Sequence, residues 1–476
     1  MINRQFTAMI CFSIGLAHSV AAQSAWDNPS DIPVVEPVTL GLAGEKPADI
    51  VRYLMARGAM QTGLSPDGTQ LAFSYRVTGE PQLWIVDASG GWPTQLTFGK
   101  GITFFRWAPD GKHLLVARDA DGNEREGYYL LSADGTQERQ LLPLSDAFRS
   151  FGMFSQDGSQ FLFSSTERNG RDFDIYVTDV ADGKTRMAYE GDFGFYPRSW
   201  QPGGNLVIVD IIRGEDGNDV HLLDLASGKL TPLFQPDISA AYGNYSWLPD
   251  GSGFYLSSNQ DREYSGLAFY SLADSQLEYI ETPEADVERV SLSNDGKYLV
   301  WVLNEDGYSK IYARERNSGN RVILPEIPQG IYNLSFATTA QSASVHVTGP
   351  GTPGDVFVWD IESGKLAHTI VSTLAGLDVE TFVTPVQRAM RHEMVLSCRG
   401  FFIFQHTHKL TVNHRLWSRF MAAQLPRRDH IFRRKCNTWL ITALPYSTST
   451  CVVLRDLARP MRAWITRKSD LIPCVT

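Results

Sequence analysis

Cysteine is almost absent from most of this 476-residue chain. Cys11 is followed by no other cysteine until Cys398, so neither a disulfide nor a cysteine metal site can form between these positions. Long apolar runs are also scarce, because only residues 6–20 form one and this run is too short to span a bilayer. The long middle region must therefore be held by an apolar core, for which a hydrophobic content of 43% is sufficient.

The early apolar run has the form of a secretory signal peptide. Arg4 precedes it, and Ala21 and Ala22 supply the small residues of a cleavage site. We expect a signal peptide over residues 1–22, a linker over 23–42, and an exported protein that is periplasmic or secreted. A buried N-terminal strand or helix is the alternative.

One short phrase with a proline or polar residue, an aspartate and a glycine returns along the middle of the chain. Its last glycines lie 43, 47, 46, 47 and 45 residues apart, and each phrase is followed by an apolar or aromatic triplet. The phrases are Ser65–Gly68, Ala108–Gly111, Ser155–Gly158, Gln201–Gly204, Leu248–Gly251 and Ser293–Gly296. A constant period in this range is typical of propeller blades.

Each phrase predicts a tight turn between two strands. Proline presets one backbone angle, and Asp and Gly accept the unusual dihedral angles of turns. A seventh unit over 334–365 keeps the period without the Asp-Gly turn. We therefore predict an all-β fold, a seven-bladed β-propeller over residues 43–378, with six or eight blades as alternatives. Trp84, Trp107, Trp200, Trp247, Trp301 and Trp359 recur near the expected strands and are interpreted as blade packing.

Charge divides the chain into two unlike parts. Residues 1–385 carry 27 basic and 49 acidic side chains, whereas residues 386–476 carry 16 basic and 4 acidic ones, with four cysteines and a single glycine. The acidic part discourages binding to nucleic acid or anionic lipid. The basic part needs a separate explanation.

Three explanations compete for residues 386–476. His406, His408, His414 and Cys436 are potential zinc ligands, but their spacing matches no strong zinc pattern, and an exported protein is an unusual partner for nucleic acid. A disulfide-linked cap is a second explanation. The third is translation out of frame, which would leave a disordered tail because an unselected sequence lacks consistent patterning.

The third explanation can be examined by shifting the codon phase. If the original codons began at the third base of the present ones, Cys451–Met461 permits R-G-S-T-G-F-G-K-T-Y-A. In the same phase Arg419–Gln424 permits V-H-G-G-P and Arg391–Val395 permits A-R-D-G. The three stretches share one phase and follow one another in order, which favours a one-base change near the codons of residues 385–388.

Glu167–Tyr176, Arg118–Glu124 and Leu377–Phe382 give the chain a family resemblance. From about residue 48 to 385 it resembles the prolyl oligopeptidase family of serine peptidases, in its dipeptidyl or acylaminoacyl peptidase branch. The resemblance implies a propeller that gates the access of short peptides to an α/β-hydrolase domain, joined here through a linker over 379–385. It implies no cofactor and no metal.

The resemblance also implies that chemistry depends on a Ser, Asp and His beyond the shifted region, with the Ser in a G-x-S-x-G turn. No G-x-S-x-G occurs in this chain, so no catalytic residue can be assigned and the chain as given is expected to be inactive. The alternative function is a non-enzymatic periplasmic scaffold similar to TolB-like propellers, although residues 23–47 are too few for the additional domain of those proteins.

Blade loops in the family sometimes hold the amino terminus of the substrate with carboxylates. Glu124, Arg125 and Glu126 occupy such a loop and are the candidate substrate-binding residues, with a solvated hairpin as the simpler interpretation. Glu167 and Arg168 precede an Asn-Gly turn and are expected to be exposed.

The phase shift makes a prediction about DNA. We expect the sequence downstream of this gene, translated in the original phase, to encode a G-x-S-x-G turn followed by Asp and His. Resequencing across the codon of Pro385 and translating the downstream region checks this, and a region without that coding potential would refute the shift.

Overall fold

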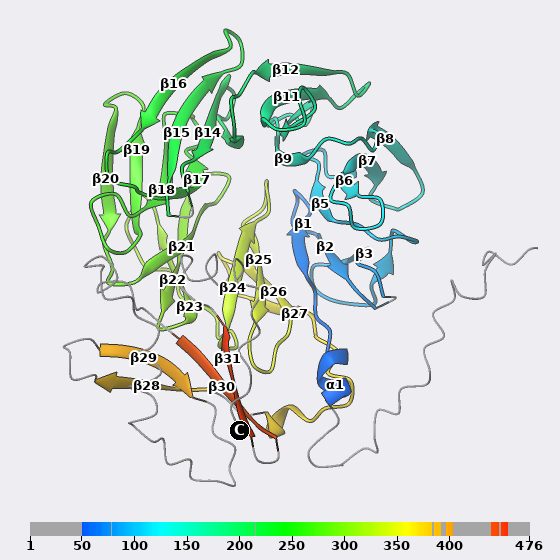
Figure 1. Cartoon of the computed structure of the whole chain (residues 1–476), viewed down its shortest axis with the longest axis vertical. Helices are drawn as coiled ribbons and strands as arrows, with labels where there is room; N and C mark the ends of the chain where they lie inside the picture. The colour runs from blue at the N-terminus through cyan, green and yellow to red at the C-terminus, as the bar shows by residue number, and fades with distance from the viewer. Residues whose placement is uncertain are drawn as a thin grey trace, which may run out of the picture.

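The computed structural model describes residues 50–77, 79–214, 216–382, 385–391, 397–402, 439–446 and 449–455. From residue 61 to 370 its strands form seven antiparallel sheets, each built from consecutive strands (Figure 1). The predicted all-β, seven-bladed propeller is confirmed. The strands occupy a narrower range than the predicted 43–378, and a short helix, α1 (Ile50–Met55), precedes them.

The blades follow one another in chain order. Blade 1 contains β1 (Gln61–Leu64), β2 (Gln70–Tyr75), β3 (Gln82–Asp87) and β4 (Thr94–Gln95). Blade 2 contains β5 (Phe104–Trp107), β6 (His113–Arg118), β7 (Gly127–Ser132) and β8 (Glu138–Leu142). Blade 3 contains β9 (Arg149–Phe154), β10 (Gln160–Ser165), β11 (Asp174–Asp179) and β12 (Thr185–Tyr189). Blade 4 contains β13 (Phe195–Trp200), β14 (Leu206–Ile212), β15 (Asn218–Asp224) and β16 (Lys229–Phe234).

The remaining blades complete the ring. Blade 5 contains β17 (Tyr242–Trp247), β18 (Gly253–Ser258), β19 (Gly266–Ser271) and β20 (Gln276–Glu281). Blade 6 contains β21 (Asp286–Leu292), β22 (Tyr298–Glu305) and β23 (Tyr308–Glu315). Blade 7 contains β24 (Ile331–Phe336), β25 (Ser342–Thr348), β26 (Asp355–Asp360) and β27 (Leu366–Ile370), and a 3-10 turn, η1 (Val379–Thr381), follows.

Blade 6 has three strands where four were expected. The chain after β23 begins an outer strand, since the amide of Val322 donates to the carbonyl of Ala313 at 3.0 Å. Pro325 and Pro328 then follow, and proline has no N–H with which to extend a ladder. The fourth strand is therefore replaced by an irregular segment.

The recurring aspartates organise the turns between the first and second strands. Asp67 Oδ1 accepts hydrogen bonds from the Ser65 hydroxyl at 2.6 Å and from the amide of Thr69 at 3.1 Å. These bonds lower the pKa of Asp67, and an equivalent set lowers the pKa of Asp157 to about 2. The aspartate thus closes the turn with its side chain as well as tolerating the backbone conformation.

The recurring glycines and prolines join one blade to the next. Gly296 has a φ of 69°, and a Cβ built on it would lie 2.9 Å from Cδ of Pro249 in the preceding blade. Gly158 faces Pro109 in the same manner at 3.2 Å, and Gly111 faces Pro66 at 3.6 Å. The phrase that marks each blade in the sequence is therefore also a contact between blades.

The apolar core is divided among the interfaces between blades. Seven clusters of buried side chains occur in the described part of the chain, and each one combines residues from two adjacent blades. The six tryptophans highlighted above pack in six different clusters, which confirms their interpretation as blade packing. Each blade thus depends on both neighbours for its stability.

Blades 1 and 7 close the ring without sharing a strand. Leu64 and Phe73 of blade 1 pack in one cluster with Val356 and Val358 of blade 7. Backbone hydrogen bonds join Arg57 and Thr373 in both directions at 2.8 Å. We call this junction the seam, and Figure 1 shows β1 beside β25 at this point.

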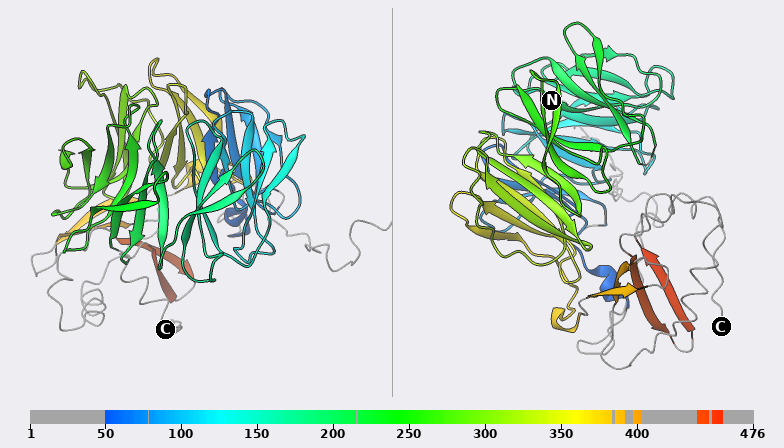
Figure 2. Two further views of the ribbon diagram at one scale, coloured as in Figure 1. Left: turned by 90° about the horizontal axis from the view of Figure 1, so that it is seen from above. Right: turned by 90° about the vertical axis from the view of Figure 1, so that its left-hand side faces the viewer.

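Antiparallel pairing gives the propeller two distinct ends. Turns between first and second strands lie at one end, which we call the turn face, whereas loops between second and third strands lie at the other. Helix α1 precedes β1 and residues 371–382 follow β27, so both lie at this second end, which we call the terminal face (Figure 2). Arg52 Nη1 donates to the carbonyl of Ala375 at 2.9 Å, which ties the two segments together.

Residues 386–476 include four described strands. They are β28 (Val386–Arg391), β29 (Ser397–Phe402), β30 (Trp439–Tyr446) and β31 (Ser449–Arg455), and they pair in that order in one sheet. The rest of this segment, the predicted signal peptide and the predicted 23–42 linker lie outside the described residues, so the expectation of a poorly ordered tail stays a prediction. In the part of the chain that is described, no helix has the length and apolar character to cross a membrane.

The blade-to-blade contact at Gly296 can be separated from its backbone strain. Gly296→Ala places a methyl group in the left-handed region, which costs about 1–2 kcal/mol, and forces it against Pro249, which adds about 1–3 kcal/mol. Gly319→Ala is the matched control, because Gly319 has a φ of 73° and open space around it. Urea unfolding should show the larger loss for Gly296→Ala. Equal losses would mean that the turn contact does not contribute.

Candidate functional site

Two loops on the terminal face carry the charged residues that the sequence singled out. The first joins β6 to β7 and contains Glu124, Arg125 and Glu126, and the second joins β10 to β11 and contains Glu167 and Arg168. They belong to adjacent blades 2 and 3. Both loops are of the second-to-third strand type, which explains why they lie at the same end of the ring.

Arg149 connects the two loops. It lies at the start of β9 and its side chain is only 2% exposed. Its Nη1 donates to the carbonyl oxygens of Glu126 at 2.8 Å and Pro143 at 2.5 Å, and its Nη2 lies 3.9 Å from the Glu167 carboxylate. The guanidinium therefore fixes the end of the first loop against the exposed carboxylate of the second.

The three predicted binding residues have different environments. Glu124 is exposed with a φ of 60°, and its amide donates to Asp119. Arg125 stacks on Phe148, with its guanidinium carbon 3.2 Å from the ring centroid, and its buried Nη1 has no hydrogen-bond partner among the described residues. Burial raises the pKa of the Glu126 carboxyl, and the charge of Arg149 opposes this rise. Only Glu124 fits the picture of a solvated hairpin.

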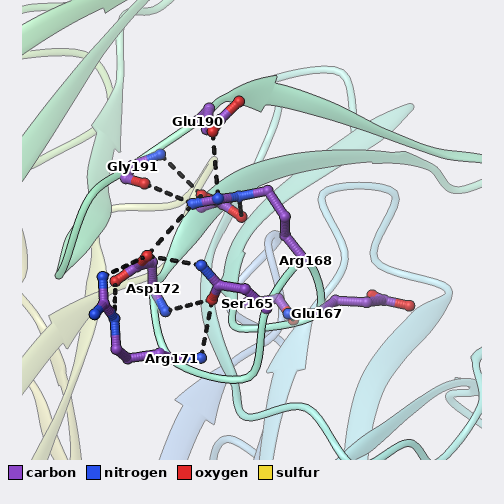
Figure 3. Close-up of polar contacts among 9 residues, drawn as sticks. Ser165, Glu167, Arg168, Arg171, Asp172, Glu190 and Gly191 are labelled. Atoms are coloured by element: carbon purple, nitrogen blue, oxygen red, sulfur yellow. Dashed lines mark hydrogen bonds and ion pairs between the residues drawn. The ribbon is translucent and has the colours of Figure 1, made fainter.

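Arg168 is held by a network that the sequence did not predict (Figure 3). Its Nε and Nη2 form a bidentate pair with Asp174 at 2.9 and 3.0 Å, and Nη2 also donates to the carbonyl of Gly191 at 2.8 Å. Nη1 lies 3.2 Å from Glu190. Asp174 is fully buried and also accepts from the amide of Gly191 at 2.8 Å, so the loop is tied to the start of the next blade.

The tip of the second loop is closed by Asp172. Its carboxylate accepts from Asn169 at 2.7 Å and from Arg171 at 2.8 Å, and the hydrogen bond from Arg171 is the main cause of its lowered pKa. Asp172 and Asp174 are engaged in these contacts. The neighbouring acids Glu167 and Glu190 have exposed carboxylates, at 52% and 67%. Neither loop contains a histidine.

Sequence reasoning missed Arg149 and Asp174. The available signal for Arg149 was weak: one arginine between the aromatic residues Phe148 and Phe151 at the start of a strand. Asp174 begins a strand and gives no sign of its bond to Arg168 six residues earlier. No group of three or more potential metal ligands gathers within the described ranges, and His406, His408, His414 and Cys436 lie outside them.

Comparison with known families gives a match over the later blades of the ring. Residues 200–370 match the family described as prolyl oligopeptidase, N-terminal beta-propeller domain. The chain carries the propeller of a prolyl oligopeptidase-family peptidase. The resemblance seen in the sequence is thereby confirmed.

Curated relatives include named peptidases. Dipeptidyl-peptidase 5 of Porphyromonas gingivalis is 24% identical over 200 residues, which are 40% of this chain and 28% of that protein. Dipeptidyl aminopeptidase BIII of Pseudoxanthomonas mexicana is 26% identical over 135 residues, 27% of this chain and 19% of that protein. The match therefore spans less than a third of either relative.

Solved structures show the same fold. A prolyl endopeptidase matches with a TM-score of 0.62 and 14% identity, over 75% of this chain and 55% of that one. Prolyl oligopeptidase B from Galerina marginata matches with a TM-score of 0.58 and 14% identity, over 73% and 56%. In both, the match covers about half of the comparison chain.

The Arg168 network allows two acids on one arginine to be compared. Asp174→Asn removes the buried partner, and we expect a loss of about 1–3 kcal/mol in unfolding free energy because Arg168 keeps other partners. Glu190→Gln removes an exposed partner and should change it by less than about 0.5 kcal/mol. Urea denaturation of both variants measures the difference. Similar values for the two would show that the buried pair does not anchor the loop.

Proposed function

We propose that this chain is the propeller part of an exported serine peptidase that acts on short peptides. The observation that carries the proposal is the family match of residues 200–370, which lie in a ring of seven blades. The signal-peptide pattern of residues 1–22 supports export. In this proposal the propeller restricts access to a hydrolase domain that adjoins its terminal face.

The terminal face supplies the first contact for the substrate. An α-amino group has an ordinary pKa of about 7.7–8.0, so a short peptide with a free amino terminus is largely cationic at neutral pH. Glu167 presents an exposed carboxylate whose loop is fixed by Arg149 and Arg168. Glu124 lies exposed in the neighbouring loop. These two carboxylates hold the amino terminus of the peptide.

The chain as given binds such a peptide without cleaving it. No G-x-S-x-G is present in its sequence, and the three family-like stretches of residues 386–476 arise only in the shifted phase. The proposal is therefore a peptidase propeller followed by an out-of-frame segment. Repair of the reading frame would restore the hydrolase half.

One substrate tests binding and turnover together. We expect trialanine p-nitroanilide to bind the 476-residue chain weakly, measured by NMR line broadening, and to release no p-nitroaniline. Glu167→Gln should weaken binding about two- to fivefold, as for one exposed ion pair. N-acetylation of the peptide should weaken it likewise, because it removes the cation.

The control is Glu278→Gln, an exposed glutamate on the outer strand β20. It should bind as the unaltered chain does. Equal effects of the Glu167 and Glu278 variants would refute the assigned carboxylate. Release of p-nitroaniline that a serine-directed inhibitor abolishes would show instead that a nucleophile has been overlooked.

A further inference from the structure

A cavity at the seam gathers basic side chains in an otherwise acidic propeller. It has a volume of about 340 Å³ and is lined by Arg57, Gly58, Arg76, His346, Thr348 and Pro353, together with their neighbours. No aspartate or glutamate lines it. This composition stands out because the first 385 residues carry a large excess of acids.

At the cavity, the backbone of the segment before β1 approaches the backbone of blade 7 unusually closely. A Cβ on Gly58 would lie 2.4 Å from Cα of Gly354, so only glycine allows the segment before β1 to cross blade 7 here. The amide of Ala59 donates to the carbonyl of Gly354 at 2.9 Å. The cavity is thus bounded by blade 1 on one side and blade 7 on the other.

The charge in the cavity comes from its arginines. Nη1 of Arg57 donates a hydrogen bond to the carbonyl of Leu54 at 2.6 Å. Arg76 is exposed, and within the described residues its guanidinium has neither a hydrogen bond nor an ion pair. His346 donates from Nε2 to the carbonyl of Ala59 at 2.8 Å, and burial lowers its pKa, so it is a neutral wall at pH 7.

Asp355, the buried acid whose charge acts on His346, is already occupied. The charge of Asp355 opposes the lowering of the His346 pKa by burial. However, Asp355 Oδ2 lies 2.8 Å from Nε2 of His368, and its Oδ1 accepts from the amide of Ser372 at 3.0 Å. It is therefore engaged with blade 7 itself. The two arginines are left without a carboxylate partner in the cavity.

We propose that the seam cavity binds a small oxyanion, carried as a phosphate or a carboxylate group. Guanidinium groups match the planar, bidentate geometry of these anions, and the volume lies within the range of small-ligand sites. Thr348 adds a hydroxyl from blade 7. The bound anion joins the two blades that share no strand, so its occupancy stabilises the closed ring.

Thermal unfolding of the full chain with inorganic phosphate and with succinate tests this site. At 20 mM of either probe and matched ionic strength in NaCl, we expect the Tm to rise by about 1–3 °C, as a ligand specific for the folded state requires. Arg76→Gln should abolish the rise. Arg186→Gln, at an exposed arginine of the outer strand β12, should retain it.

Calorimetric titration with phosphate gives a second readout that does not depend on stability. We expect one site in the unaltered chain, and an affinity at least tenfold lower in Arg76→Gln but unchanged in Arg186→Gln. A rise with phosphate alone would assign the site to phosphate groups, and a rise with both probes to oxyanions in general. No rise with either probe, or the same rise in both variants, would overturn the proposal.

Discussion

Apolar contact between the first and last blades is the constraint on which the rest of this molecule depends. A ring of seven sheets has seven interfaces, and the one between blades 1 and 7 is formed by segments almost three hundred residues apart. Six interfaces can form as the chain folds locally, but this last one requires the whole ring to be complete. Until it forms, Phe73 and Val358 face water and two blades each expose an apolar side.

The distribution of charge follows from the same geometry. The interior of each interface is apolar, and charged side chains such as Asp174 and Arg149 lie at the ends of their strands. Buried charges therefore need partners at these ends, as Asp174 has in Arg168 and Arg149 has in the backbone carbonyls. The loops that meet at Arg149 are consequently well fixed, although they lie at the surface.

The sequence was sufficient to predict the architecture. The turn phrase occurs six times, and each copy encodes both a reversal of the chain and a contact between blades. The sequence was less informative where a local feature departs from the blade repeat. Pro325 and Pro328 remove a strand from blade 6, and the bidentate pair of Arg168 joins residues with no shared pattern. Arg149 acts through tertiary contacts with the carbonyls of Glu126 and Pro143, which local periodicity does not encode. The exposed position of Glu124, by contrast, follows directly from its loop.

The hydrogen bonds between Arg57 and Thr373 have a consequence for how the blades of this propeller could be connected. Their backbones are hydrogen bonded in both directions, so the two ends of the ring already lie side by side. A short covalent link there, with a new opening in the exposed connection between blades 4 and 5, would give a circular permutant with every interface intact. Chain order is thus incidental to the finished ring, whereas the succession of blades is not.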